Sequence, residues 1–286
     1  MNKLHKKDFS IAFKTGSDAN KSKFKKEAVQ GEIYHATDTG LFYVAETTAG
    51  AIDATLAQFG GSVFTNDYSV EFDGGNDSMD VSSTSDFAFG SSGFSISFWL
   101  NGSSNNTTGF GVNIFDMRSI VGGSQPSLWI ETKGANSLVK YYAFGSYRVS
   151  TTATLDAGTW YHVVITNDGS TSKIYLDGNT TPIGTGSDPT NYVAAPLRVG
   201  GYHGNNYYFD GLIDEFSIFS SELSASDVSN IYSSGVPDNL SSYSPIGWWR
   251  MGDNDNGTGT TITDQGSGGN DGTLTNGPTF STDVPS

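Results

Sequence analysis

Hydrophobic and polar positions alternate over short stretches along most of the chain, and the most informative stretch is Trp160–Gly178. Two runs rich in β-branched and aromatic residues, Trp160–Thr166 and Lys173–Asp177, flank the sequence NDGS, which is typical of a turn. The first run carries apolar residues on both faces, as a strand does when it is covered on both sides. The pattern therefore predicts a hairpin inside a β-sandwich.

The same alternation predicts strands throughout residues 61–236, with one helix near the end of that region. The helix is expected to begin near Ser224, a favourable N-cap residue with Asp227 three positions later, and to end before Gly235. Strands beyond the hairpin are expected at Tyr68–Val81 (with a turn), Phe94–Leu100, Gly109–Met117, Ser127–Thr132, Val139–Phe144, Tyr147–Thr151, Pro196–Gly201 and Phe209–Phe219.

Composition favours an all-β protein with many tight turns. Glycine accounts for 36 of the 286 residues, well above the usual share of about 7%. The chain has no cysteine, which excludes disulfides and thiol chemistry. Its hydrophobic runs are too short to span a bilayer, and its N-terminus lacks the apolar region of a signal peptide. We therefore expect neither membrane insertion nor export by the general secretory route.

Charge divides the chain into a basic arm and an acidic body. Residues 1–30 hold eight lysines against three acidic residues, a net charge of +5, whereas the remainder holds seven basic and 27 acidic residues, a net charge of −20. Such asymmetry indicates that the arm has a partner of its own, unless it is simply a solvated terminus. Nucleic acid is not expected as that partner, because no aromatic stacking platform or arginine-rich run accompanies the lysines.

A second hairpin is predicted just after the arm. In Gly31–Gly50, strands Glu32–Ala36 and Leu41–Ala45 flank the turn sequence TDTG. The pattern G-E-x-x-x-x-T-D-T-G-x-x-Y-V is similar to a short module near the N-termini of tailed-phage fibre and head-decoration proteins, where it joins the virion. This resemblance implies that residues 1–60 form an anchoring arm and hairpin.

The central hairpin resembles the W-x-H-V-x-x-T-x-D-G…L-Y-V-D-G signature of laminin-G-like, concanavalin A-type domains. The runs YSVEFDGGNDSMDV, FSISFWL, PLRVGG and FDGLIDEFSIF, followed by the helix, resemble other blocks of that family in the family's order. The resemblance implies an antiparallel β-sandwich of the jelly-roll type. This fold alone does not specify a function, because it carries many different sites.

The C-terminal block is out of the family's usual order. Pro245–Val284 contains WWRMGD and TDQGSGGNDGTLTNGP, which resemble a block that normally precedes the FDG strand. Residues 237–286 are therefore expected to complete the 61–236 sandwich as a permuted element, in the same chain or in a neighbouring subunit.

Calcium is the metal that the resemblance implies. The loop carrying Asp264 and Asn270 is similar to a family loop that meets a bound calcium, and Asp214 is similar to another ligand. Hard cations prefer such clustered oxygen ligands. The alternative is that the loop is a turn rich in glycine and Asx residues.

Sugar binding is the chemistry that a different loop suggests. The sequence GGYHGNNYYF places aromatic rings beside amides, and its candidate ligand-binding residues are Tyr202, His203, Asn205, Asn206 and Tyr207. Trp129, Tyr141 and Tyr142 are expected nearby.

Catalysis is not expected. A glycoside hydrolase needs two carboxylates at a fixed separation across the scissile bond. Asp214 and Glu215 are adjacent on one predicted strand, which would point them to opposite faces. His162 lies in the middle of a strand, where we expect a core imidazole rather than a general base.

Together these features predict a structural protein on the surface of a tailed-phage virion: a capsid decoration protein, a head fibre or a tail-fibre component. We expect a homo-oligomer whose residues 1–60 bind other virion proteins and whose sandwich binds a host-surface glycan. An alternative is a glycan-binding adhesin or an accessory carbohydrate-binding protein, and a third is a polysaccharide hydrolase.

Overall fold

The computed structural model describes residues 13–16, 33–36, 41–45, 56–59, 64–103, 111–118, 126–133, 136–151, 153–188, 191–204 and 206–286. The chain forms two compact units, Met1–Thr65 and Asn66–Ser286. No helix in the described ranges is both long and apolar enough to cross a membrane.

The first unit contains a four-stranded sheet with the order β1-β2-β3-β4. The expected hairpin is present as β2 (Ile33–Ala36) and β3 (Leu41–Ala45), which pair antiparallel. Two further strands, β1 (Phe13–Gly16) and β4 (Leu56–Phe59), flank the hairpin and were not predicted. Four-residue strands are too short to show a clear alternation, which explains why the sequence did not reveal them.

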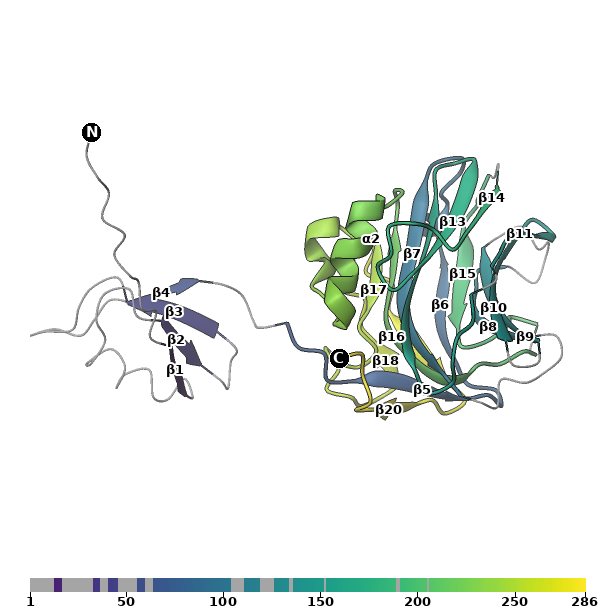
Figure 1. The fold of residues 1–286 in the computed structure, drawn as a ribbon. Helices are drawn as coiled ribbons and strands as arrows, with labels where there is room; N and C mark the ends of the chain where they lie inside the picture. The colour runs from purple at the N-terminus through teal and green to yellow at the C-terminus, as the bar shows by residue number, and fades with distance from the viewer. Residues whose placement is uncertain are drawn as a thin grey trace, which may run out of the picture. The chain divides into compact units, whose positions relative to one another are not determined.

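The second unit consists of two eight-stranded sheets that form a sandwich (Figure 1). The first, here called the helix-covered sheet, has the order β14-β13-β12-β7-β16-β5-β20, and β17 also pairs with β16. Its strands are β5 (Ser69–Asp73), β7 (Phe94–Gly102), β12 (Trp160–Asn167), β13 (Thr171–Leu176), β14 (Gly184–Ser187), β16 (Asp210–Phe219), β17 (Gly247–Trp249) and β20 (Thr279–Ser281).

The second sheet, here called the opposite sheet, has the order β11-β10-β9-β8-β15-β6-β19-β18. Its strands are β6 (Ser78–Thr84), β8 (Val112–Asp116), β9 (Ser127–Lys133), β10 (Asn136–Ala143), β11 (Ser146–Ser150), β15 (Ala195–Val199), β18 (Thr261–Ile262) and β19 (Gly272–Thr275). Described helical segments are α2 (Ala225–Tyr232) and the short 3-10 turns η2 (Ser85–Phe87), η3 (Ser233–Gly235) and η4 (Leu240–Tyr243). The all-β, concanavalin A-like sandwich predicted from the sequence is confirmed.

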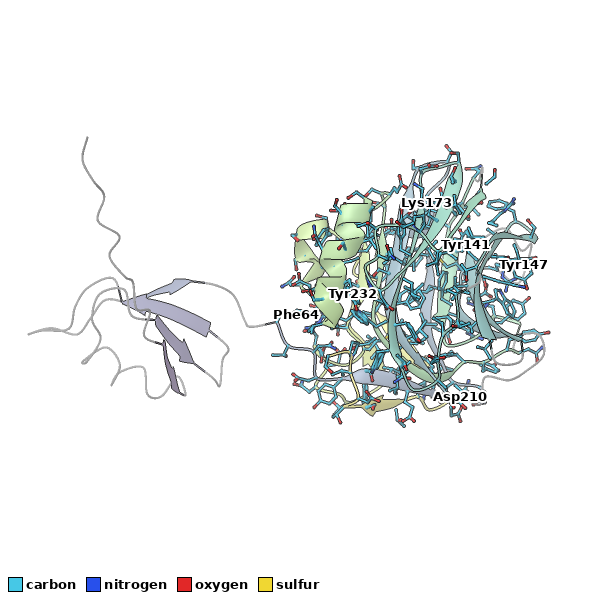
Figure 2. All side chains as sticks on the ribbon, viewed as in Figure 1. Phe64, Tyr141, Tyr147, Lys173, Asp210 and Tyr232 are labelled. Carbon is cyan, nitrogen blue, oxygen red and sulfur yellow. The ribbon has the colours of Figure 1, made fainter. Side chains whose placement is uncertain are left out.

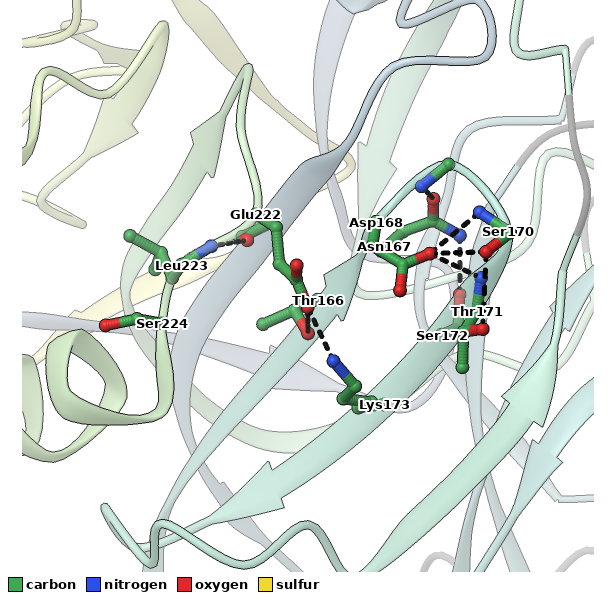
Figure 3. A network of polar contacts seen from close by, with 12 residues as sticks. Thr166, Asn167, Asp168, Ser170, Thr171, Ser172, Lys173, Glu222, Leu223 and Ser224 are labelled. Carbon is green, nitrogen blue, oxygen red and sulfur yellow. Dashed lines mark hydrogen bonds and ion pairs between the residues drawn. The ribbon is translucent and has the colours of Figure 1, made fainter.

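The central hairpin forms as predicted, with β12 antiparallel to both β7 and β13. At its turn, Asp168 Oδ1 accepts hydrogen bonds from the backbone N–H and hydroxyl of Ser170 and from the backbone N–H of Thr171, at 2.8–2.9 Å (Figure 3). Gly169 has a φ of +92°, and a Cβ there would lie 2.4 Å from the carbonyl oxygen of Ser91. Only glycine fits this position without displacing the neighbouring backbone.

Aromatic side chains fill the space between the sheets. The ring of Phe98 from β7 stacks on that of Phe216 from β16, with centroids 5.4 Å apart, and meets Phe115 of the opposite sheet edge-on at 6.1 Å. All three residues are completely buried. Burial of one such side chain stabilises the fold by roughly 1.5–3 kcal/mol.

Helix α2 covers the outer face of the helix-covered sheet. Its N-cap is Ser224, as predicted, and Ser224 and Asp227 form a capping box. The ring of Tyr232, at the end of the helix, stacks on Trp99 of β7 with a centroid separation of 5.5 Å. Among the described elements, no helix covers the outer face of the opposite sheet (Figure 1).

The C-terminal block supplies strands to both sheets of its own chain. Strand β20 pairs with β5, and Phe280 lies opposite Val70. Strand β19 pairs with β6 in the opposite sheet. Trp249, in β17, is fully buried within the core. Residues 66–286 consequently form a single compact unit.

Candidate functional site

A group of aromatic and charged side chains lies on the outer face of the opposite sheet. In the ladder of β8, β9 and β10, Trp129 is opposite Asn113 on one side and Lys140 on the other. Its neighbours along β9, Leu128 and Ile130, point into the core. Because side chains alternate along a strand, the ring of Trp129 points away from the core.

Three half-buried rings form the centre of this group, here called the aromatic cluster: Trp129, Tyr202 and Tyr207. Trp129 lies 6.1 Å from Tyr202 and 5.1 Å from Tyr207 between ring centroids, and the two tyrosine rings are 6.3 Å apart. Next to the cluster, the rings of Tyr142 and Tyr147 meet edge-on at 5.5 Å. Tyr147, on strand β11, is 49% exposed and lies at the outer edge of the second unit (Figure 2).

Arg118 joins these rings together. Its guanidinium carbon lies 4.6 Å from the ring centroid of Tyr202, 4.9 Å from that of Tyr142 and 5.4 Å from that of Trp129. A cation over an aromatic face is attracted by the ring quadrupole. The arginine Nε also donates a 2.6 Å hydrogen bond to Asp116 Oδ1.

Asp116 connects the arginine to the loop that follows β15. Its Oδ2 accepts a hydrogen bond from the backbone N–H of His203 at 3.0 Å and lies 3.3 Å from His203 Nδ1. Burial by itself would raise the pKa of Asp116, but the hydrogen bonds from His203 and the charge of Arg118 outweigh it and hold the pKa below its usual range. The carboxylate is therefore charged at neutral pH.

Backbone conformation and backbone hydrogen bonds hold the loop after β15 against the opposite sheet. Gly200 has a φ of +87°, and a Cβ there would lie 2.4 Å from the ring of Phe72, so a side chain would be both strained and obstructed. The backbone N–H of Gly200 donates to Ile114, and that of Asn113 donates to the carbonyl oxygen of Tyr207. These bonds hold Tyr202 and Tyr207 above β8 and β9.

Three buried polar atoms in or next to the aromatic cluster have no hydrogen-bond partner. They are Arg118 Nη2, Trp129 Nε1 and Asn113 Oδ1. The side-chain nitrogen of Asn113 does have one, because it donates to Ser127 Oγ at 2.6 Å. Unpaired buried groups are uncommon in native proteins, and a bound water or ion is one way in which such groups are satisfied.

The structure brings together part of the predicted glycan-binding set. Tyr202, His203 and Tyr207 lie with Trp129 and Tyr142, as expected, and Asn206 is exposed beside them. Asn205 lies outside the described residues. One expectation was wrong: Tyr141 points into the core, where its hydroxyl is hydrogen-bonded to that of Tyr192 at 2.6 Å.

Sequence reasoning did not identify Asp116 and Arg118 as part of this site. Asp116 ends β8 and Arg118 follows two positions later, and this spacing carries no motif by itself. A partial signal was available, because Arg118 is one of only seven basic residues in 66–286.

The predicted calcium ligands are arranged as follows. Asp264 Oδ1 accepts hydrogen bonds from the backbone N–H groups of Trp248 and Gly266, both at 2.7 Å, and Oδ2 accepts from that of Asn270 at 2.8 Å. Asp214 is engaged elsewhere, by Asn66 Nδ2 at 2.9 Å and by the backbone N–H of Glu215 at 2.8 Å. The described side chains include no group of three or more His, Asp or Glu residues that could hold a metal ion. Asp264 and Asp214 are thus each engaged by different hydrogen-bond donors of the chain.

The adjacent carboxylates Asp214 and Glu215 are both buried. Glu215 accepts hydrogen bonds from Trp248 Nε1 at 2.5 Å and from Arg250 Nε at 2.9 Å. Burial and the neighbouring Glu215 raise the pKa of Asp214 well above its usual range. These partners tie the C-terminal block to β16.

His162 is buried, as expected, but it packs against Trp99 and Tyr232 beneath helix α2 rather than within the core cluster, and its Nδ1 has no hydrogen-bond partner. Its Nε2 is hydrogen-bonded to Ser97 Oγ at 2.8 Å. Burial lowers its pKa to about 3, so the ring is neutral.

The family model of the concanavalin A-like lectin/glucanases superfamily matches residues 73–229, more than half of the chain. The chain belongs to this superfamily. Solved structures agree with the assignment at the level of the fold. A candidate carbohydrate-binding protein from Bacteroides ovatus aligns over 90% of this chain and 71% of its own length, with a TM-score of 0.60 and 16% identity.

Two further solved structures align with lower scores. The heptameric SAP-like pentraxin of Limulus polyphemus aligns over 60% of this chain and 84% of its own, with a TM-score of 0.46 and 14% identity. The receptor-binding domain of botulinum neurotoxin mosaic serotype C/D aligns over 60% of this chain and 43% of its own length, with a TM-score of 0.45 and 21% identity. Among curated proteins no match was found.

Proposed function

We propose that the second unit is a lectin-like module that binds carbohydrate through the aromatic cluster. The observation that carries this proposal is the grouping of Trp129, Tyr202 and Tyr207 within 5.1–6.3 Å of one another, beside Asp116 and His203. Ligand sites combine apolar and aromatic surfaces with a few placed polar groups. A sugar ring offers both an apolar C–H face and hydroxyl groups, so it suits this combination.

Two comparisons support the proposal. The superfamily to which the chain belongs includes lectins in its name. The Bacteroides ovatus protein with the same fold is itself considered a carbohydrate-binding protein.

The test is glycan-array screening of the full chain, followed by calorimetric titration of the best ligand. Trp129→Ala and Tyr202→Ala should each weaken binding about tenfold, because an aromatic contact contributes roughly 0.5–1.5 kcal/mol beyond its buried area. Tyr243→Ala, which removes a half-buried tyrosine from η4, is the matched control and should leave affinity unchanged. Absence of any glycan binding, or an equal loss in the control, would refute the proposal.

We further infer that the chain is a structural protein of a tailed-phage virion, with the first unit as its anchor. The supporting observations are the TDTG hairpin, the net charge of +5 in residues 1–30, and the separation of the first unit as a compact body. An arm of positive charge suits an acidic partner surface, which in a virion would be the capsid or the tail.

Mass spectrometry of purified phage particles tests this role directly. The protein should be present in the particles, and a chain lacking residues 1–60 should remain folded but be absent from them. Normal incorporation of the shortened chain would rule out the anchoring function. Absence of the intact protein from particles, together with glycan binding, would instead favour an adhesin.

A further inference from the structure

Positive charge is concentrated on one part of the second unit. Residues 66–286 carry seven basic residues against 23 acidic ones. Five of the seven lie in or just after the neighbouring strands β8, β9, β10, β11 and β15 of the opposite sheet. They are Arg118, Lys133, Lys140, Arg148 and Arg198.

Two of these cations border the aromatic cluster. Lys140 pairs with Trp129 across the β9–β10 ladder, and its Nζ lies 4.7 Å from the ring centroid of Tyr147. Arg118 lies over Trp129, Tyr142 and Tyr202. The rings therefore hold both cations next to the surface where a sugar would stack.

The unpaired polar atoms at this place are mostly donors. Arg118 is only 9% exposed and its Nη2 has no acceptor, and Trp129 Nε1 has none either. An arginine fork matches the two oxygens of a carboxylate or a sulfate better than it matches a hydroxyl group. The Nε of Arg118 is already bound to Asp116, and its buried Nη2 is the guanidinium nitrogen that has no acceptor.

We infer that the aromatic cluster selects acidic sugars, whose carboxylate or sulfate group is held by Lys140 and Arg118. This inference rests on the proposed carbohydrate-binding function and names the ligand class. The excess of acidic residues in the rest of the unit repels a polyanion. Recognition of an acidic glycan therefore requires a local group of cations, and Lys140 and Arg118 supply two of them beside the half-buried rings of the aromatic cluster.

The experiment compares acidic glycans with neutral derivatives of the same backbone. Suitable pairs are oligogalacturonate with its methyl ester, and a sulfated galactan with its desulfated form, each titrated into the full chain. The acidic member of at least one pair should bind about tenfold more tightly than the neutral member. Because the attraction is between charges, this preference should shrink as the salt concentration rises.

Variants with matched charge assign the preference to the cluster. Lys140→Gln and Lys173→Gln each remove one positive charge, but Lys173 lies on β13 in the helix-covered sheet, where it pairs with Glu222 at 2.7 Å (Figure 3). Lys140→Gln should abolish most of the acidic preference, and Lys173→Gln should leave it unchanged. Arg118→Lys, which keeps the charge but removes the fork, should weaken acidic binding several-fold while its melting temperature is monitored.

Each outcome bears on a different statement. Equal binding of acidic and neutral members, lost in Tyr202→Ala, would overturn the acidic selectivity and leave the carbohydrate-binding function intact. Acidic binding that survives Lys140→Gln and Arg118→Lys unchanged would assign it to another basic segment and would also overturn the inference. Failure of every glycan to bind would refute the carbohydrate-binding function itself.

Discussion

At the scale of single residues, the most consequential feature is a carboxylate that the fold buries at the junction of β16 and the C-terminal block. Glu215 is 3% exposed. Burial raises its pKa to about 7, against the opposing effects of Arg250 and Trp248. Burial raises the pKa of Asp214 and of Asp253 as well.

These shifts predict that the protein becomes more stable as the pH falls from about 7.5 to 5.5. In this window the folded state holds a proton on Glu215 that the unfolded chain, whose glutamate pKa is near 4.5, does not hold. The stabilisation is thus present at low pH and is lost as the pH rises through about 7. Glu215→Gln should flatten the dependence of the melting temperature on pH, whereas Glu71→Gln, at an exposed position, should not. A wild-type melting temperature that decreases as the pH is lowered from about 7.5 to 5.5 would contradict the prediction.

Asp264 allows the calcium expectation to be separated from a purely structural role. Its carboxylate caps three backbone N–H groups, each of which would be left unpaired in Asp264→Ala at a cost of roughly 1–3 kcal/mol. That variant should melt well below the wild type with or without a chelator. If the loop binds calcium, a chelator should lower the melting temperature of the wild type by several degrees, since a bound ion stabilises the native state by mass action. Identical wild-type melting curves would show that the loop works as a turn.

Single residues also show where sequence reasoning stops. Tyr202, His203 and Tyr207 could be found because they share one loop of unusual composition. Asp116 and Arg118 could not, because their partners come from distant parts of the chain that only the β8–β15 pairing brings close. Tyr141 was assigned to the wrong side because a shift of one residue reverses the face of every side chain on a strand.

At the scale of elements, the longer strands and the helix were all predicted in order, because their alternation and end signals are local. Strand β14 was missed: its sequence GTGS has no apolar residue, and it pairs only as the edge strand beside β13. Edge strands with such polar sequences give no periodic signal.

The N-terminus of helix α2 allows the predicted capping residue to be tested directly. Ser224 Oγ accepts the backbone N–H of Asp227, and the Asp227 carboxylate accepts that of Ser224. Ser224→Ala should lower the free energy of unfolding by about 1 kcal/mol, as measured by denaturant titration. Ser229→Ala, an exposed position in the middle of the same helix, is the control and should be neutral or slightly stabilising because alanine has the higher helix propensity. An equal loss in both variants would exclude capping as the cause.

At the scale of the whole molecule, the order of the blocks along the chain decides how the sandwich closes. The sequence identified the C-terminal block as one that belongs beside the FDG strand, but local patterns could not tell whether it docks in its own chain. The structure pairs β20 with β5 and β19 with β6 in the same chain. The edges of both sheets are therefore completed by residues more than 180 positions away in the sequence.

This closure predicts the effect of removing the block. A chain ending at Leu240 would lose β17, β18, β19 and β20, together with the buried Trp249, Met251, Ile262 and Leu274. Each buried side chain contributes roughly 1.5–3 kcal/mol, and a whole domain is stable by only about 5–15 kcal/mol. The shortened chain should therefore aggregate, since β5 and β6 would expose unpaired edges.

Co-expression of residues 241–286 as a separate chain should restore soluble protein, because the same strands would again cover those edges. The complex of the two chains would be detected by size-exclusion chromatography. A shortened chain that stays monomeric with an unchanged melting temperature would show that the block is not needed to close the sandwich.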